Sequence, residues 1–519
     1  MERASKSRGR GRPYRPPLDS SPWSSVSGGT SARVAWLLGT SRMLHAGGAY
    51  ANRQEFLPKL VARGIRVDNT KLSRWESGTG SISPEVVQAY EEILGLPAQQ
   101  LRSTVSLLTG TSAAPTPAED PATADRALDG LVETVLSGES CGGGCWVELT
   151  GQLSQHPAMF LRASLWRDLA TRLISELSRS VGVAYTARLS ALHQLIAHPM
   201  AHNEVVAAIG QYVTDPHAVR VTDVVASLSY APSVSGRYLA LGLLASEDPA
   251  LRAGAARTIA AMKAAGAWVT ALDETLEKSV IALLDRSSAG DELAHAHGNA
   301  DLLRYLGREP LAHVISELGN DRHHQFVLDH STLTSPATAS LIAANVTATA
   351  QASAPSLGEA PDPMLERLVR EALFHSHAER RHRALVVLMS SPYAAGIGAA
   401  AAGLLNADDP LVARRAAELL RFCITPAETP HVLEAPVARH TEVQAAALTA
   451  LGHVERLDDS HVDDMLAQSE PWPAARRGQA TVYVLGMHGL TDRLASRSVP
   501  SHVESAAAWW RRAGARVAV

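Results

Sequence analysis

Alanine-rich helical segments recur along the second half of the chain, and this recurrence limits the possible folds more than any other feature. Their centres lie at Ala384, Ala416, Ala446 and Ala480, at intervals of 32, 30 and 34 residues. Small side chains at these centres let neighbouring helices approach closely. Beyond residue 125 almost no segment alternates apolar and polar residues as a strand would. We therefore expect an all-α chain built largely from stacked helical repeats.

The dipeptide Asp-Pro marks a second recurrence. Asp215-Pro216 and Asp248-Pro249 are 33 residues apart, and Asp409-Pro410 lies 161 residues further on, near five such periods. Each Asp can cap a helix that Pro begins. The pattern resembles HEAT repeats, in which two antiparallel helices per unit stack into an α-solenoid. A tetratricopeptide or irregular helical array is the alternative.

The resemblance to HEAT repeats covers residues 126–519. We expect a first part over 126–345 and a second part over 363–519, separated by a flexible loop or boundary at 346–362. A solenoid has a long concave surface, and this one would be acidic, which favours a protein partner or a basic ligand over DNA. Dispersed charge that serves only solubility is the alternative.

The N-terminal part predicts five short helices between residues 31 and 108. Asn52, Asp68 and Ser83 are favourable N-caps for the second, third and fourth of them. The third helix, over residues 70–78, places Leu72 and Trp75 on one side and polar side chains on the other. Because helices this short are unstable alone, they must pack together.

Residues 67–78 read Val67-Asp68-Asn69-Thr70-Lys71-Leu72-Ser73-Arg74-Trp75-Glu76-Ser77-Gly78, and Ser83-Pro84-Glu85 and Leu94-Gly95-Leu96 follow. This stretch resembles the Xre/phage-repressor family of helix-turn-helix DNA-binding proteins. The resemblance covers about 75 residues. It implies a five-helix domain over 31–108 with a recognition helix in the major groove, often from a homodimer on a palindromic site.

Carried onto this sequence, the resemblance implies base-reading side chains and phosphate contacts. The base-reading positions are Asn69, Thr70, Ser73 and Arg74; the phosphate contacts are Lys71, Arg53 and Gln54. Glu76 and Gly78 would have structural roles. The connection over residues 64–68 is about two residues longer than is usual between such helices.

Charge is distributed unevenly along the chain. Residues 1–105 hold 15 Lys and Arg against 8 Asp and Glu, a net charge of +7, whereas the remainder carries −11. Residues 1–30 should form a disordered basic arm. Within it, Arg10 and Arg12 resemble the core of an AT-hook that lies in the minor groove, the alternative being a non-specific polybasic tail. Residues 109–125, rich in Ser, Thr, Ala and Pro, should be a linker that lets the N-terminal domain over 31–108, the head, move independently.

Several classes of protein and of site are not expected. Three cysteines are too few for a disulfide framework, and no apolar run approaches the ~18 residues of a membrane helix, so we expect a cytoplasmic, nucleoid-associated protein. Cys141 and Cys145 have no second pair and should lie in a flexible loop. The histidine clusters lack metal-site spacing, so we expect no metal or other cofactor. They are His295/His297, His323/His324/His330 and His375/His377/His382.

Double-stranded DNA and a protein partner of the acidic array are therefore the expected partners. The function we expect is sequence-specific transcriptional regulation, with the array receiving a partner or signal. The alternative is a solenoid scaffold or antitoxin-like inhibitor with an autoregulatory DNA-binding head. No catalytic residue is expected, because the sequence has neither a phosphate-binding glycine loop nor a nucleophile elbow. An alkylpurine DNA glycosylase, the enzymatic alternative, would need a basic groove.

Overall fold

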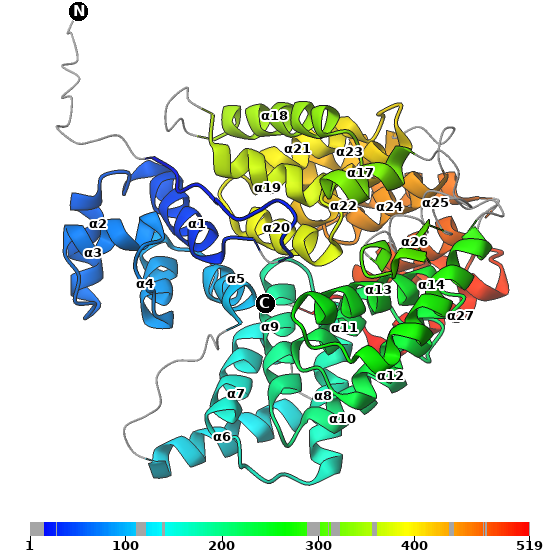
Figure 1. The fold of residues 1–519 in the computed structure, drawn as a ribbon, viewed down its shortest axis with the longest axis horizontal. Coiled ribbons are helices and arrows are strands. Elements are labelled where there is room, and N and C mark those ends of the chain that lie inside the picture. The colour runs from blue at the N-terminus through cyan, green and yellow to red at the C-terminus, as the bar shows by residue number, and fades with distance from the viewer. Residues whose placement is uncertain are drawn as a thin grey trace, which may run out of the picture.

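The computed structural model describes residues 15–26, 28–110, 121–137, 141–287, 302–309, 311–312, 322–354, 361–434, 441–470, 472 and 475–517. Over these ranges the secondary structure is helical, apart from one isolated antiparallel bridge between Thr332 and His375. The predicted all-α fold class is confirmed. Figure 1 shows a small N-terminal head beside a larger helical array.

The head consists of five helices, as predicted. They are α1 (Thr30–Leu44), α2 (Arg53–Ala62), α3 (Asn69–Ser77), α4 (Pro84–Leu94) and α5 (Gln100–Thr109). Trp36, Phe56, Leu72 and Tyr90 are fully buried among them. These side chains come from four different helices, so each helix is stabilised by a core that none could form alone.

The array follows in two parts. The first contains α6 (Pro121–Leu136), α7 (Gly143–Gln155), α8 (Ala163–Ser178), α9 (Gly182–Ala197), α10 (His202–Tyr212), α11 (Val221–Ala226), α12 (Val234–Leu244), α13 (Pro249–Ala264) and α14 (Asp273–Ser287). The second contains α17 (Arg322–His330), α18 (Pro336–Ala352), α19 (Pro363–Phe374), α20 (Ala378–Ser390), α21 (Ala394–Leu404), α22 (Pro410–Cys423), α23 (Thr429–Glu434), α24 (Thr441–Leu451), α25 (Asp459–Ser469), α26 (Ala475–Met487) and α27 (Ser501–Ala513).

The four alanine-rich segments form one row of stacked helices. Ala384, Ala416, Ala446 and Ala480 lie in α20, α22, α24 and α26, and successive members of this row are in contact. Each of α22, α24 and α26 also packs against the helix that precedes it. Three of the alanines are buried and Ala446 is half-buried. The second part is therefore a HEAT-like array of paired helices, and the spacing of the alanines predicted its repeats.

The Asp-Pro signal holds at two of its three predicted positions. Asp248 and Asp409 cap α13 and α22, each accepting a hydrogen bond from the main-chain N–H two residues on, at 2.8 and 2.9 Å. The prediction is wrong at Asp215, because Pro216 lies in a turn and α11 begins only at Val221. The Asp215 carboxylate still accepts a hydrogen bond from the main-chain N–H of His217, at 2.9 Å, and its other oxygen accepts one from the indole Nε1 of Trp509, at 2.9 Å.

The two parts of the array pack on each other rather than leaving an open concave face between them. The aromatic rings of Tyr185 (α9) and Phe422 (α22) lie 6.1 Å apart. Buried between the parts, the Arg257 guanidinium is 2.8 Å from the Glu379 carboxylate and 3.1 Å from that of Asp223. The inner face of the second part is thus lined by buried ion pairs and aromatic rings that the first part covers.

The head is docked on the array, and this overturns the expectation of an independently moving head. Ser106 Oγ of α5 lies 2.7 Å from Ser190 Oγ of α9, and Thr104 Oγ1 lies 2.6 Å from Ser390 Oγ of α20. The predicted linker is also shorter than residues 109–125: Thr109 still belongs to α5, and Pro121 already begins α6. Residues 111–120 lie outside the described part of the chain.

Residues 15–26 form an ordered strap between the head and the array, although the sequence predicted a disordered arm to residue 30. The Asp19 carboxylate is fully buried against the guanidinium of Arg33. The indole of Trp23 donates to the carbonyl of Ser331 at 3.1 Å, and the guanidinium of Arg370 lies 4.2 Å from the indole ring. A buried ion pair and an aromatic anchor thus order a segment whose composition favours disorder.

The predicted interruption at 346–362 is likewise too long. Helix α18 continues to Ala352, and Val346, Thr347 and Ala350 are buried. The small side chain of Ala350 packs closely against α21, where a Cβ added to Gly396 would lie 2.8 Å from Ala350 Cα. The Thr and Ala residues that resemble a linker in sequence are therefore helix-packing residues. Residues 355–360 are not among those described.

Candidate nucleic-acid interface

Helices α2 and α3 form the predicted helix-turn-helix pair and pack against each other. Asn52 caps α2 by accepting from Gln54 N at 3.0 Å, and Asp68 caps α3 by accepting from Lys71 N at 2.6 Å. Gly78 ends α3 with φ +76°, in the left-handed region that favours glycine. Both ends of α3 are therefore fixed by the residue types that the sequence places there.

The polar side of α3 faces outward. Asn69, Thr70 and Arg74 are exposed and Ser73 is half-buried, whereas Leu72 is fully buried on the opposite side. Figure 1 shows α2 and α3 at the outer end of the head, and α5 at the end beside the array. The predicted base-reading residues thus share one accessible surface, which we call the α3 face.

A buried carboxylate fixes α3 to the rest of the head. The guanidinium groups of Arg42 and Arg53 both bond to the Glu76 carboxylate, through Arg42 Nε at 2.5 Å and Arg53 Nε at 2.8 Å. The Tyr90 hydroxyl donates to the same carboxylate at 3.1 Å, and burial together with Glu76 raises the pKa of Tyr90 well above its ordinary value. Because one carboxylate bonds to groups from α1, α2 and α4, the structural role predicted for Glu76 is confirmed.

The three predicted phosphate contacts differ in availability. Gln54 is exposed at the start of α2, and the positive end of the helix dipole there attracts phosphate. Arg53 is committed to Glu76 and also lies 3.3 Å from the hydroxyl of Ser73, although a third of its side chain is exposed. Lys71 is exposed, and its Nζ donates to the carbonyl of Arg66 at 2.9 Å.

Arg74 is the most available cation of the α3 face. Its main-chain carbonyl caps the turn after α3, accepting from the N–H groups of Thr79 and Gly80. Within the part of the chain that the structure describes, its guanidinium has no ion pair and is exposed. Arg10 and Arg12, the predicted minor-groove residues, lie outside the described residues.

The cysteines and histidines singled out in the sequence make structural contacts where the structure describes them. Cys145 lies in the first turn of α7 and Cys141 just before it, so the pair does not occupy a flexible loop. The hydrogen bond with Cys145 and burial raise the pKa of the Cys141 thiol. His375 Nε2 lies 2.6 Å from the carbonyl of Trp23, and His382 Nε2 lies 3.4 Å from the Tyr185 hydroxyl. His295 and His297 are outside the described ranges, as are the side chains of His323 and His324.

The described residues contain neither a metal site nor a membrane-spanning helix. No group of three or more His, Cys, Asp or Glu side chains there is arranged to hold a metal ion. Among the described helices, none combines the length and apolar character needed to cross a membrane.

Comparisons with known proteins do not assign the chain to a family. No family model matches the sequence, and no curated protein matches it. Among solved structures, human deoxyhypusine hydroxylase in complex with glycerol has a TM-score of 0.33 at 15% identity, over 63% of this chain and 98% of that one. An engineered protein has a TM-score of 0.21 at 15% identity, over 80% of this chain and 98% of that one. The karyopherin Kap121p bound to the SUMO protease Ulp1p has a TM-score of 0.25 at 12% identity, over 94% and 50%. Scores this low carry over no function.

Proposed function

We propose that this chain is a sequence-specific regulator of transcription, related to the Xre type, that binds double-stranded DNA in the cytoplasm at the nucleoid. The α3 face is the observation that carries the proposal. Asn69, Thr70 and Arg74 project from a helix that is capped at both ends and anchored by Glu76. In the major groove an arginine can bond bidentately to guanine, and an asparagine to adenine.

The charge of the N-terminal arm and head together supports the same proposal. Residues 1–105 carry +7, and positive charge steers a protein toward phosphate backbones. Gln54 and Lys71 flank the α3 face, where they would contact phosphates and fix the register of the helix on the duplex. The array, with its net negative charge, would stay off the DNA and hold the head through α5.

Affinity sequencing of genomic fragments with the full chain tests this function. We expect one shared sequence motif to be enriched, and an Arg74→Ala variant to lose or relax the motif. Lys278→Ala is the matched control, because Lys278 is an exposed cation on α14, far along the chain from the head. Absence of any enriched motif with the wild-type chain would overturn the proposal. A palindromic motif bound by two chains would support the expected homodimer.

A protein-binding role of the array is the second candidate. Val234 and Tyr238 lie one turn apart on α12 and are 66% and 60% exposed, and Val269 is 41% exposed. The Arg237 guanidinium donates to the carbonyl of Ala267, which brings α12 beside the segment that carries Val269. Exposed apolar side chains that gather in this way are typical of interaction sites. They suit a scaffold or an antitoxin-like inhibitor.

Co-purification from the native host tests this second role. A partner that binds the wild-type chain but not a Val234→Ser/Tyr238→Ser variant would support it, provided that the variant keeps the wild-type unfolding midpoint. A partner retained equally by both chains would show that this surface is not the binding site.

A further inference from the structure

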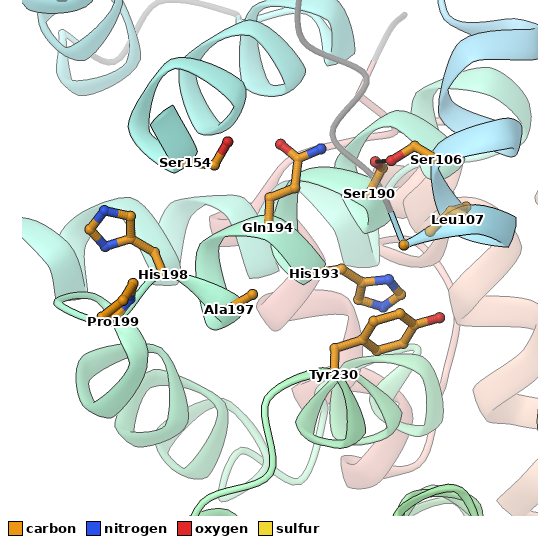
Figure 2. Close-up of a pocket in the computed structure, with 11 residues that line it drawn as sticks. Ser106, Leu107, Ser154, Ser190, His193, Gln194, Ala197, His198, Pro199 and Tyr230 are labelled. Carbon is orange, nitrogen blue, oxygen red and sulfur yellow. Dashed lines mark hydrogen bonds between the residues drawn. The ribbon is translucent and has the colours of Figure 1, made fainter. Parts of the chain in front are cut away.

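A pocket lies where the head meets the array. Its volume is about 240 Å³, and its lining comes from α5, α7, α9 and the short helical turn at 227–230. Figure 2 shows Gln194 between Ser154 on one side and Ser190 on the other, with the rings of His193 and Tyr230 below. Head and array both line the pocket, because Ser106 and Leu107 belong to the last helix of the head.

Two polar groups in the lining lack partners. Gln194 Nε2 is buried and has no hydrogen-bond partner among the described residues, while its Oε1 lies 2.9 Å from the hydroxyl of Thr150. Exchanging the amide O and N would leave the oxygen without a partner instead. His193 Nδ1 is also buried and has no partner among the described residues. Unsatisfied buried polar groups are costly, so a ligand that bonds to them gains affinity.

The lining is uncharged. It contains no Asp, Glu, Lys or Arg. Burial lowers the pKa of His193 well below its ordinary value, so its ring is neutral near pH 7. An ionic ligand would lose its hydration here without gaining an opposite charge. An uncharged polar ligand loses far less.

The aromatic rings and apolar side chains of the lining favour a flat ligand. The rings of His193 and Tyr230 are stacked, with centroids 3.4 Å apart and planes inclined by 18°. Leu107, Ala197 and Pro199 add apolar surface. The volume is below the roughly 300–1,000 Å³ of sites for drug-sized ligands, which limits the occupant to a molecule of one or two small rings.

We propose that this pocket binds a small, flat, uncharged molecule with an amide or lactam group, whose C=O and N–H bond to Gln194 and His193. The regulatory part of this inference, an effect of the ligand on DNA binding, rests on the proposed function. Helix α5 lines the pocket and also packs against α1 and α4 of the head, so an occupant contacts the element that holds the head in place. A ligand that prefers one position of α5 would change the affinity of the α3 face for DNA.

Three isosteric probes test the chemistry of the pocket. Benzamide is uncharged, benzoate carries a negative charge and benzamidine a positive one, and 2-pyrrolidone serves as a second uncharged probe. With the full chain, ligand-observed NMR titration should show saturable binding of at least one uncharged probe, and binding at least tenfold weaker for both charged ones. Equal binding of all probes, or no binding of benzamide and 2-pyrrolidone, would overturn the proposal.

Two variants place the binding in this pocket. Ala197 is exposed at the edge of the lining, so Ala197→Trp should fill the pocket without disturbing the core, and uncharged-probe binding should be lost. Ala207→Trp is the matched control, since Ala207 is an exposed alanine on α10 outside the lining, and its binding should equal that of wild type. Retention of binding by Ala197→Trp would refute the assignment.

A separate DNA measurement keeps this inference distinct from the proposed function. Probe binding needs no DNA, so a chain that binds benzamide in the pocket but never binds DNA would support the site and refute the regulator. A chain that binds both, with the same DNA affinity at every probe concentration, would refute the coupling through α5.

Discussion

The guanidinium of Arg33 in α1 and the carboxylate of Glu371 in α19 form a fully buried ion pair, 2.6 Å apart, across the junction of head and array. The strap adds a second acid, because the Asp19 carboxylate lies 2.9 Å from Arg33. The array adds a second cation, since the guanidinium of Arg380 is 2.5 Å from the Glu371 carboxylate. Since Arg33 and Glu371 are 338 residues apart in sequence, this charge network joins the strap and α1 to the array.

Removing one member of this network should destabilise the docked state. Glu371→Gln keeps the size of the side chain but removes the carboxylate that pairs with Arg33, Arg367 and Arg380. We expect the free energy of unfolding, measured by urea denaturation, to fall by about 3–5 kcal/mol, the range for breaking a buried pair. Glu274→Gln is the control, because that carboxylate pairs with Lys278 on the surface and its loss should leave the midpoint unchanged. Equal midpoints for both variants would contradict the importance of the network.

Acid should destabilise the fold through buried histidines. Burial lowers the pKa of His382 from 6.5 to about 4. Between these two values the unfolded chain binds a proton that the folded chain does not, so stability is present above pH 6.5 and is lost as the pH falls toward 4. His382→Gln should therefore reduce the drop in urea midpoint between pH 7 and pH 5, whereas the exposed His431→Gln should leave it as in wild type. An unchanged drop in the His382 variant would refute this assignment.

Local sequence signals predicted much of the fold. The caps at Asp68, Asp248 and Asp409 depend on residues within a few positions of each other, and the alanine-rich helices recur at a regular interval, so a single sequence displays both signals directly. Asp215 shows where prediction from such local signals fails. The same Asp-Pro dipeptide forms a turn there: Asp215 accepts from the main-chain N–H of His217, and its other oxygen accepts from the indole of Trp509, 294 residues away.

The candidate site was predictable to the same degree. The outward positions of Asn69, Thr70 and Arg74 follow from helical periodicity around Leu72. The engagement of Arg53 with Glu76 did not follow, because it depends on how α2 crosses α3. The docking of the head through Ser106 and Ser190, and the pocket beside that contact, likewise depend on packing between distant segments.

A side chain at Gly78 should destabilise the turn after α3. Its φ of +76° disfavours other residues, and an added Cβ would lie 3.1 Å from the carbonyl oxygen of Ser31 in α1. Gly78→Ala should lower the free energy of unfolding by about 1–2 kcal/mol, the penalty for the left-handed conformation. Gly403→Ala is the matched control, since Gly403 is exposed within α21 with open space around it, and should be neutral or slightly stabilising. A loss as large at Gly403 would contradict the conformational explanation.

Arg74 and Lys71 should separate base reading from phosphate binding. If the Arg74 guanidinium bonds to a base edge, Arg74→Ala should weaken binding to the enriched site by about 1–3 kcal/mol and relax the preference at one base pair. Lys71→Ala should instead weaken binding to all sequences alike and reduce the salt slope by about one, because one phosphate contact is lost. Fluorescence anisotropy on the enriched site and on single-base variants, at several salt concentrations, measures both effects. A uniform loss for Arg74→Ala would reassign that residue to the phosphate backbone.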